Sequence, residues 1–407
     1  MDRGPSAIPV ATRASTPDKR STGQSPRALL RTVRDVADDL AADALGRDQA
    51  GRPPTDELAR LREAGLLAAL TPPGPGRGAD WQTACTAIRE IAAADSSVGA
   101  VLARHYAYAW SARLYAGHHH AGLEEESARA QWLWTGAVRT PAPHDDTTGS
   151  DLTLRPRGLG HLLSGRRSVD TVAALADQIV VDAVCAVTGD VLVVRIAPGA
   201  RGVTVDTAHD RLGQRVSGAG EAVLDRVTVA PGQVLGRRPP DTEPAAPVST
   251  LADAVVRLAL CHVGLGIAEG ALTEARDLSR SGRGHRLPGD PDLLMTYGEL
   301  ASAAQTATAV VGRATTATAQ ALEAGAHPDA EEAAGLAALV ATAETVTPKA
   351  ALLVSARVLE LGDAPGLDRF WRNARVLTAH LPVAQRLRSI GEHYLNGPHR
   401  AGAAAFG

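Results

Sequence analysis

The C-terminal part of the chain contains four long segments rich in alanine and leucine, at residues 249–281, 292–323, 329–361 and 367–396. Prolines lie between successive segments, at Pro288, Pro328 and Pro365. Because proline cannot continue the interior of an α-helix, each segment is predicted to be a separate helix. Long helices joined by short loops favour an antiparallel arrangement, so we predict a C-terminal four-helix bundle over residues 249–400.

Two regions that precede this bundle differ from it in pattern. Residues 25–130 have helical periodicity and predict an N-terminal helical domain, with N-caps at Ser25, Asp56 and Asp80. Over residues 131–238, short β-branched runs such as QIVVDAV and DVLVVRI are divided by Gly, Asp and Pro, which is typical of antiparallel strands. The prediction is therefore a mainly α protein with a small central antiparallel β-barrel domain.

The remaining segments and the charge pattern restrict the partners of the protein. Residues 1–24 predict a disordered tail, and the proline-rich residues 239–248 predict a linker. The formal net charge is -3 and no stripe of lysine or arginine is present. This pattern argues against nucleic acid or an anionic membrane as a partner and leaves a small molecule as the expected one.

The sequence also predicts a cytoplasmic location. No apolar run reaches the roughly 18 residues that span a bilayer, and the polar N-terminal segment lacks an apolar core for secretion. No disulfide framework or zinc site is expected from three widely spaced thiols without a C-x-x-C pairing, Cys85, Cys185 and Cys261. No metal is predicted either, because adjacent helical residues splay by about 100° and cannot converge on one ion, as in His118, His119 and His120.

Local motifs follow one another in a distinctive order along most of the chain. They are ELARLREAGLLAALTPPGPGRG and IREIAAADSSVGAVLARHYAY in the helical region, GHLLSGRRSVDTVAALADQIVV and HDRLGQRVSGAGEAVLDRVTV in the β region, and LDRFWRNARVLTAHLPVA near the end. Each motif is weak alone, but their order and spacing from about residue 55 to 397 resemble the acyl-CoA dehydrogenase superfamily. The resemblance implies the same order of helical domain, β domain and four-helix bundle.

One position in the last motif departs from the dehydrogenase pattern. When RNARVLTAHLP is aligned with R-D-A-K-x-x-x-I-Y-E-G, the glutamate that abstracts a substrate proton falls on Leu381, which cannot act as a base. Its neighbour His380 can donate or accept a proton near neutral pH. With LGQR-x-S-G-x-G and F-W-R-N-A-R, this change makes the chain most similar to flavin-dependent group D monooxygenases of the dibenzothiophene monooxygenase type.

Similarity to these monooxygenases implies a two-component oxidoreductase that assembles as a homotetramer. Such enzymes receive reduced flavin from a separate NAD(P)H-dependent flavin reductase. They form a C4a-hydroperoxyflavin with O2 and transfer one oxygen atom to an S, N or C centre of a small molecule, for which secondary metabolism is one fitting context. Gly362 and Asp363 replace the paired glycines of FAD-binding relatives, which favours reduced FMN (FMNH2) over FAD because the backbone can no longer approach a second phosphate closely.

The resemblance also implies catalytic and substrate-binding roles. His380 would donate a hydrogen bond near the flavin, and Leu381 would help to keep the pocket dry. His105 shares an apolar helix face, so it is either a packed core histidine or a catalytic group on the substrate side of the flavin. Tyr106 and Trp110 would line the same pocket. His380 also has the alternative interpretation of a core histidine.

Several residues align with flavin-binding positions of the family. Two lie in the run WLWTGAVRT where the first flavin-facing strand falls, two are hydroxyl residues of the following strand pair, and two are arginines suited to phosphate. They are Trp134, Thr135, Ser168, Thr171, Arg280 and Arg283. The arginine of the family reaches a flavin phosphate across a subunit boundary. The alternatives are solvent-facing strand hydroxyls and an exposed cationic loop.

Two other functions are consistent with the sequence. An acyl-CoA dehydrogenase could take its base from another bundle helix, for which the candidates are Glu269, Glu274 and Glu299, although these also suit surface positions. A non-catalytic member kept for assembly would have lost its flavin, since both the first strand motif and the adenine loop depart from the family pattern.

Overall fold

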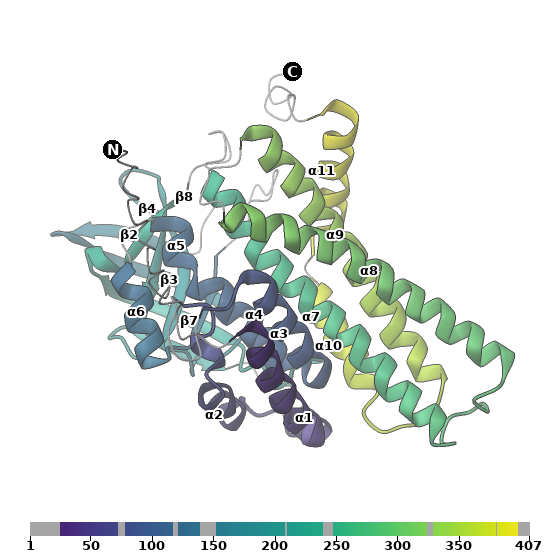
Figure 1. Cartoon of the computed structure of the whole chain (residues 1–407). Coiled ribbons are helices and arrows are strands. Elements are labelled where there is room, and N and C mark those ends of the chain that lie inside the picture. The colour runs from purple at the N-terminus through teal and green to yellow at the C-terminus, as the bar shows by residue number, and fades with distance from the viewer. Residues whose placement is uncertain are drawn as a thin grey trace, which may run out of the picture.

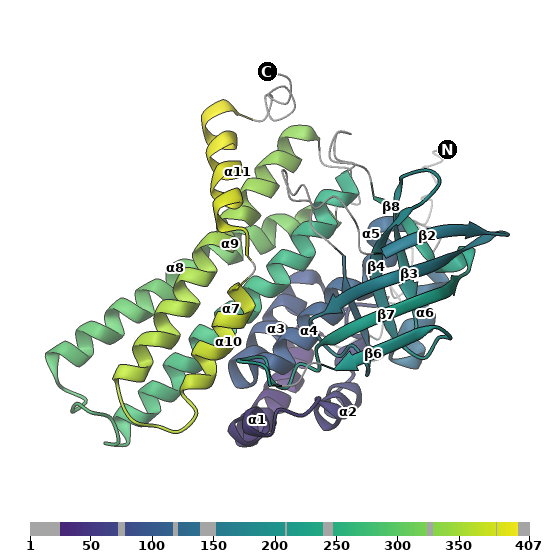
Figure 2. The ribbon, with the colours of Figure 1, turned by 180° about the vertical axis from the view of Figure 1, so that it is seen from behind.

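The protein is described by a computed structural model over residues 25–71, 78–116, 121–138, 152–207, 210–238, 247–323, 329–379 and 381–397. A sheet lies at one end of the molecule and the long C-terminal helices lie at the other, with N-terminal helices between them (Figure 1). The view from behind shows the same arrangement (Figure 2). The predicted order of helices, β domain and helical bundle is confirmed.

The N-terminal region forms α1 (Pro26–Ala50), α2 (Thr55–Glu63), η1 (Leu66–Ala68), α3 (Trp81–Ala94), α4 (Ser96–Ala109), α5 (Ser111–Ala116) and α6 (Ala121–Ala130). Two of the predicted N-caps are confirmed. The Ser25 hydroxyl accepts from the N–H of Ala28 at 3.3 Å, and the Asp80 carboxylate accepts from the N–H of Thr83 at 2.6 Å. The third is wrong, because Asp56 lies inside α2, which follows a proline.

The β region forms one mixed sheet rather than an antiparallel barrel. Its strands are β1 (Trp134–Ala137), β2 (Leu152–Arg157), β3 (Gly160–Val169), β4 (Gln178–Cys185), β5 (Val191–Ile196), β6 (Val203–Thr207), β7 (Gly220–Val229) and β8 (Val234–Arg238), with η3 (Pro231–Gln233) before the last. The order is β6-β7-β3-β2-β4-β5-β8, and β1 pairs with β4. Both β1 and β2 run parallel to β4, and no pairing joins β6 to β8 across the described strands.

The bundle contains one helix more than predicted. Its elements are α7 (Pro247–Arg280), α8 (Pro291–Glu323), α9 (Ala330–Arg357), η4 (Val358–Glu360), α10 (Asp368–Thr378) and α11 (Val383–Asn396). The segment predicted as a single helix, 367–396, is broken before Val383, and α11 leaves at an angle to α10 (Figure 2). Pro382 accounts for the break, because a proline disfavours helical geometry at the residue before it.

Glycines on α7 allow it to approach α3 closely. A Cβ atom at Gly266 would lie 2.6 Å from the Cβ atom of Ala92, and one at Gly270 would lie 2.3 Å from the carbonyl oxygen of Ala93. Both distances are far below van der Waals contact, so a larger residue would push the two helices apart. The glycines therefore set the position of α7 relative to the N-terminal helices.

Two bundle helices are more apolar than the sequence analysis expected. By length and composition, Leu251–Arg280 and Glu331–Glu360 could each cross a membrane, with mean hydropathy of 1.7 and 1.3 over their most apolar windows. In the fold, 78% and 56% of those windows are buried inside the protein. Core helices of this kind pass the same test, so the two helices are weak evidence for a membrane segment.

Candidate active site

His105 on α4 is held by backbone groups on both sides of its ring. The residue is 1% exposed, its Nδ1 accepts from the N–H of Trp134 at 3.1 Å, and its Nε2 lies 2.8 Å from the carbonyl oxygen of Leu67. These contacts fix the neutral tautomer with hydrogen on Nε2. Burial lowers the pKa of the ring to about 4. The geometry favours the structural interpretation of His105 over the catalytic one, since neither nitrogen is free to act.

The aromatic side chains expected near the flavin are all buried but differ in hydrogen bonding. The indole N–H of Trp134 donates to Oγ of Ser127 at 2.7 Å, and that of Trp110 donates to the carbonyl oxygen of Leu70 at 3.2 Å. The buried hydroxyl of Tyr106 has no partner among the described residues. Tyr106 can therefore receive a polar ligand atom, whereas both tryptophans already use theirs inside the protein.

Thr135 and Thr171 come together where β1 meets the segment after β3. The Thr135 hydroxyl donates to the carbonyl oxygen of Thr171 at 2.8 Å, and the two hydroxyl oxygens are 3.1 Å apart. Both residues are buried. Ser168 is exposed on β3, between inward-facing neighbours. Two of the three predicted hydroxyl residues thus meet, and we call them the threonine pair.

The loop between β6 and β7 lies against the segment that carries Thr171. The N–H of Val172 donates to the carbonyl oxygen of Ser217 at 2.7 Å. In the same loop, Gln214 has a φ of 53° and a buried side-chain amide whose nitrogen and oxygen have no partner within the described ranges. The loop beside the threonine pair therefore holds a donor and an acceptor that a ligand could use.

Helix α10 joins this loop to the bundle. Asn373 accepts from the backbone N–H of Gln214 at 2.5 Å and donates to the hydroxyl of Ser96 at 2.6 Å. Gly213 packs directly on α10, where a Cβ atom would lie 2.2 Å from the carbonyl oxygen of Arg372. The first turns of α10 are thus fixed to the β6–β7 loop and to the start of α4.

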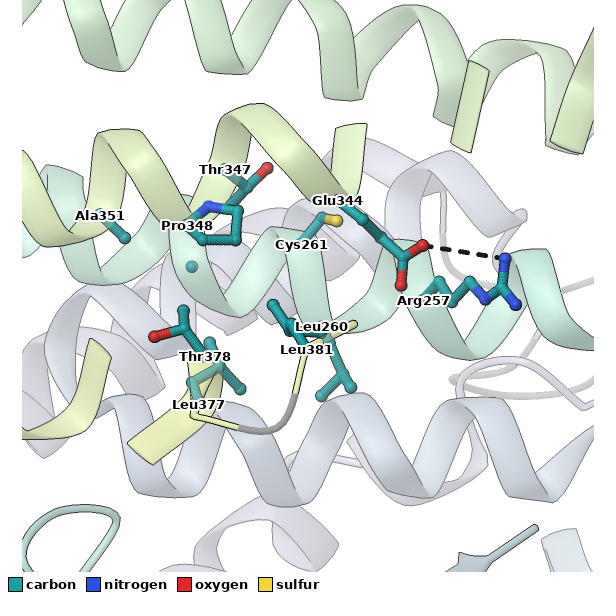
Figure 3. Close-up of a pocket in the computed structure, with 11 residues that line it drawn as sticks. Arg257, Leu260, Cys261, Glu344, Thr347, Pro348, Ala351, Leu377, Thr378 and Leu381 are labelled. Atoms are coloured by element: carbon teal, nitrogen blue, oxygen red, sulfur yellow. Dashed lines mark ion pairs between the residues drawn. The ribbon is translucent and has the colours of Figure 1, made fainter. Parts of the chain in front are cut away.

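The last turn of α10 borders a cavity between α7 and α9 (Figure 3). Its volume is about 40 Å³, and its walls are Arg257, Leu260, Cys261, Gly264, Glu344, Thr347, Pro348, Ala351, Leu377, Thr378 and Leu381. We call it the bundle cavity. Arg257 and Glu344 form its charged end, and the rest of the wall is mainly apolar (Figure 3). Leu381 stands in this wall, so the dehydrogenase base is replaced by an apolar surface.

Glu344 is the carboxylate of the bundle cavity, and two arginines hold it. It is 6% exposed, and its Oε2 lies 2.8 Å from Nε of Arg386 on α11 and 3.7 Å from Nη1 of Arg257 on α7. Burial raises the pKa of Glu344, and the two arginines oppose this shift. Protonation would leave the arginines without their counter-charge in a buried site. Glu344 is therefore unsuited to abstracting a substrate proton.

The other polar groups of the cavity wall are occupied or inert. The hydroxyl of Thr347 donates to the carbonyl oxygen of Ala343, and that of Thr378 donates to the carbonyl oxygen of Ala374, both at 2.8 Å. Burial, followed by the charge of Glu344, raises the pKa of the Cys261 thiol to about 12, so it remains protonated at neutral pH. Among the described polar groups of the wall, the buried Nε of Arg257 remains a donor without a hydrogen-bond partner.

The proposed alternative bases are not placed to abstract a proton in this cavity. Glu269 pairs with Arg89 at 3.4 Å, and Glu274 pairs with Arg369 at 3.0 Å. Glu299 is exposed on α8. None of the three borders the bundle cavity.

The remaining candidates lie elsewhere in the chain. Arg280 is the last residue of α7 and Arg283 follows the helix, and both are exposed. This end of α7 is remote from the sheet (Figure 1, Figure 2). His380 falls outside the described residues, as do His118, His119 and His120. In the part of the chain that is described, no three His, Cys, Asp or Glu side chains could hold a metal ion.

Sequence reasoning missed the charged end of the bundle cavity. Arg257 interrupts the apolar run VVRLAL, and Glu344 is the acid in VATAETVTP. A lone ionisable residue in a long apolar helix indicates a buried partner, because an unpaired buried charge is costly. The signal was present, but the partner could not be identified before the packing of α7, α9 and α11 was known.

Known protein families match both helical regions. The family model described as acyl-CoA dehydrogenase, N-terminal domain, matches residues 24–120, and the one described as acyl-CoA dehydrogenase, C-terminal domain, matches residues 258–385.

Individual relatives match nearly the whole chain. The probable FMNH2-dependent monooxygenase SfnC of Pseudomonas putida is 29% identical, over 91% of this chain and 95% of the relative. A dibenzothiophene monooxygenase of Rhodococcus erythropolis is 31% identical, over 90% of this chain and 93% of the relative. The structure of FMN-bound TdsC from Paenibacillus sp. A11-2 has a TM-score of 0.81 and 29% identity, and the match covers 90% of this chain and 97% of that one.

Proposed function

The chain belongs to the acyl-CoA dehydrogenase family, among its FMNH2-dependent monooxygenases, and we propose that it oxygenates an S, N or C centre of a small molecule. The observation that carries the proposal is Leu381 in the wall of a cavity whose own carboxylate, Glu344, is ion-paired. Electrophilic oxygen transfer removes no proton from carbon, so it needs no base at this position. Reduced FMN would come from a separate NAD(P)H-dependent flavin reductase in the cytoplasm.

The groups near the threonine pair fit an isoalloxazine ring. One edge of that ring alternates hydrogen-bond donors and acceptors, and the unpartnered amide of Gln214 offers one of each. Thr135 and Thr171 would hold the ring from the sheet, and the Tyr106 hydroxyl, which has no partner among the described residues, would be a further contact. When bound and reduced, FMN supplies the two electrons that activate oxygen.

The chain itself supplies enclosure and hydrogen bonding. Leu260, Leu377 and Leu381 would limit the entry of bulk water into the bundle cavity, which favours transfer to substrate over loss of the activated oxygen as peroxide. His380 directly precedes Leu381, and we assign it the role of hydrogen-bond donor near the site of oxygen transfer.

The phosphate of FMN would require a second copy of the chain. Arg280 and Arg283 suit a phosphate, but they lie at the end of α7 that is remote from the threonine pair (Figure 1). A homotetramer would bring this end of one subunit to the sheet of another. A groove of about 700 Å³ between α8, α9 and α11 offers a surface for such packing.

The proposal is tested by two reactions of the purified protein. With FMNH2 and air, a suitable substrate should gain one oxygen atom, and a His380→Ala variant should bind FMN normally but release more hydrogen peroxide per product. Equal coupling in variant and parent would remove His380 from the mechanism. Under anaerobic conditions, acyl-CoA thioesters should leave bound oxidised FMN unchanged. Bleaching of the flavin by a thioester would instead establish a dehydrogenase.

A further inference from the structure

Arg257 lines the charged end of the bundle cavity, and its buried Nε has no hydrogen-bond partner in the described chain. Glu344 lines the same end, and its Oε2 lies 2.8 Å from Nε of Arg386 in an ion pair. A carboxylate oxygen has two lone pairs, so this atom can accept a further hydrogen bond. Leaving a buried donor unpartnered is costly, so Nε of Arg257 beside this carboxylate indicates an occupant that would accept from the arginine.

Four ionisable side chains that the structure describes around this end balance one another in formal charge. Arg257 lies 3.6 Å from Asp253 and 3.7 Å from Glu344, and Arg386 lies 2.8 Å from Glu344. These four side chains carry two formal positive and two formal negative charges. A charged ligand would add an uncompensated charge to a buried site, which is unfavourable. The electrostatics therefore favour a neutral ligand.

The size of the cavity limits the occupant. Its volume is about 40 Å³, whereas an apolar cavity of about 150 Å³ accommodates benzene. The site therefore takes a few non-hydrogen atoms, either as a small molecule or as the end of a longer one. A fused tricyclic aromatic does not fit in this space.

We propose that the bundle cavity binds the uncharged polar end of a small substrate, a group with one hydrogen-bond acceptor and one donor, as in a primary carboxamide. The acceptor would receive a hydrogen bond from an arginine N–H, and the donor would bind Oε2 of Glu344. Apolar atoms would contact Leu260, Leu377 and Leu381. The inference relies on the proposed function only in naming the occupant a substrate, because the binding itself needs no flavin.

Four probes of equal size test this assignment on the flavin-free protein. Acetamide, acetate, acetamidinium and acetone each have four non-hydrogen atoms but differ in charge and hydrogen bonding. Ligand-observed NMR titrations should give a dissociation constant for acetamide about tenfold below that of the others, the effect of one buried hydrogen bond or charge. Tighter binding of acetate or acetamidinium, or no binding of any probe, would overturn the proposal. The last outcome would mean that the cavity holds only water.

Variants test whether acetamide binds in the bundle cavity or elsewhere on the protein. Glu344→Gln leaves an excess positive charge, so its preference should change from acetamide to acetate, while Glu299→Gln on the exposed face of α8 should behave like the parent. If Glu344→Gln does not fold, Ala351→Leu fills the cavity without altering an ion pair and should abolish acetamide binding. Its control is Ala309→Leu, at an exposed position of α8. Acetamide binding that survives Ala351→Leu would refute the location.

The two proposals can fail independently. Specific acetamide binding without FMNH2-dependent oxygenation would refute the proposed function but support the polar site in the bundle cavity. Oxygenation of a substrate whose affinity is unchanged in Glu344→Gln and Ala351→Leu would support the proposed function but refute that site.

Discussion

At the scale of single residues, two buried histidines make the stability of the protein sensitive to acid. Burial lowers the pKa of His105 to about 4 and that of His262 to about 3, from an ordinary value of 6.5. Nε2 of His262 lies 2.9 Å from the hydroxyl of Thr315, which donates to the carbonyl oxygen of Val311 and must therefore accept from the ring. Both rings are neutral in the folded protein.

The free energy of unfolding should fall when the pH drops below about 6.5, because the unfolded chain then binds protons that the folded chain does not. The His105 contribution is complete above this pH and decreases towards pH 4. Urea unfolding at pH 7 and pH 5 should show that His105→Gln reduces this pH dependence by about 2 kcal/mol. Ala309→Gln provides the control, because it introduces the same residue at an exposed position of α8 and should retain the parent slope. Parent-like slopes in both variants would contradict the assignment.

A substitution in the threonine pair should lower the affinity of the protein for FMN. Thr171→Val keeps the side-chain shape but removes the hydroxyl that lies 3.1 Å from that of Thr135. FMN affinity should fall about tenfold, which corresponds to the loss of one buried hydrogen bond of about 1 kcal/mol or more. Quenching of FMN fluorescence measures this affinity. Ser168→Ala, at an exposed position on β3, should change it little, and an equal loss in both variants would argue against a specific role for Thr171.

At the scale of secondary-structure elements, the packing of α7 on α3 predicts opposite effects for two similar substitutions. In Gly270→Ala, the new Cβ atom would lie 2.3 Å from the carbonyl oxygen of Ala93 and 2.8 Å from the ring of Phe370. Overpacking of this kind should lower the free energy of unfolding by about 1–3 kcal/mol. Gly298 on α8 has no atom within 4 Å of such a Cβ position. Gly298→Ala should therefore stabilise the protein by about 0.5–1 kcal/mol through helix propensity, and urea unfolding compares the two.

The helices also show where sequence patterns stop being informative. Long apolar periodicity located α7, α8 and α9, because each buries a continuous face. The ends of helices were harder to predict than their presence. Asp56 lies inside a helix that it was expected to cap, and the break at Pro382 was not predicted. The parallel pairing of β1 with β4 was also missed, because strand partners depend on the path of the chain and not on the composition of either strand.

At the scale of the whole molecule, exposed apolar side chains on α11 predict the assembly surface. Tyr394 borders the groove between α8, α9 and α11 and is 91% exposed, and the next residue of α11, Leu395, is 83% exposed. If subunits pack there, Tyr394→Glu and Leu395→Glu should lower the molar mass measured by size-exclusion chromatography with light scattering. Leu159→Glu, at an equally exposed turn between β2 and β3, should leave it unchanged. A monomeric parent protein would refute the homotetramer directly.

The candidate site could be predicted only in part, because some of its residues come together only through tertiary packing. Thr135 and Thr171 could be proposed from the sequence because each lies in a motif that resembles the family, and Leu381 because it stands where the family has a base; their roles stay predictions. Arg257, Glu344 and Arg386 come from three separate helices, and only their tertiary packing places them around one cavity.

Helix α10 restricts how this protein can change during evolution. Its first turns are fixed to the β6–β7 loop through Asn373, and its last turn forms part of the cavity wall through Leu377 and Thr378. Inserting one residue between these points would rotate the last turn by about 100° and shift it by about 1.5 Å. The substrate range can therefore change through side-chain replacements within α10. An insertion or deletion in α10 would instead move the cavity wall relative to the β6–β7 loop.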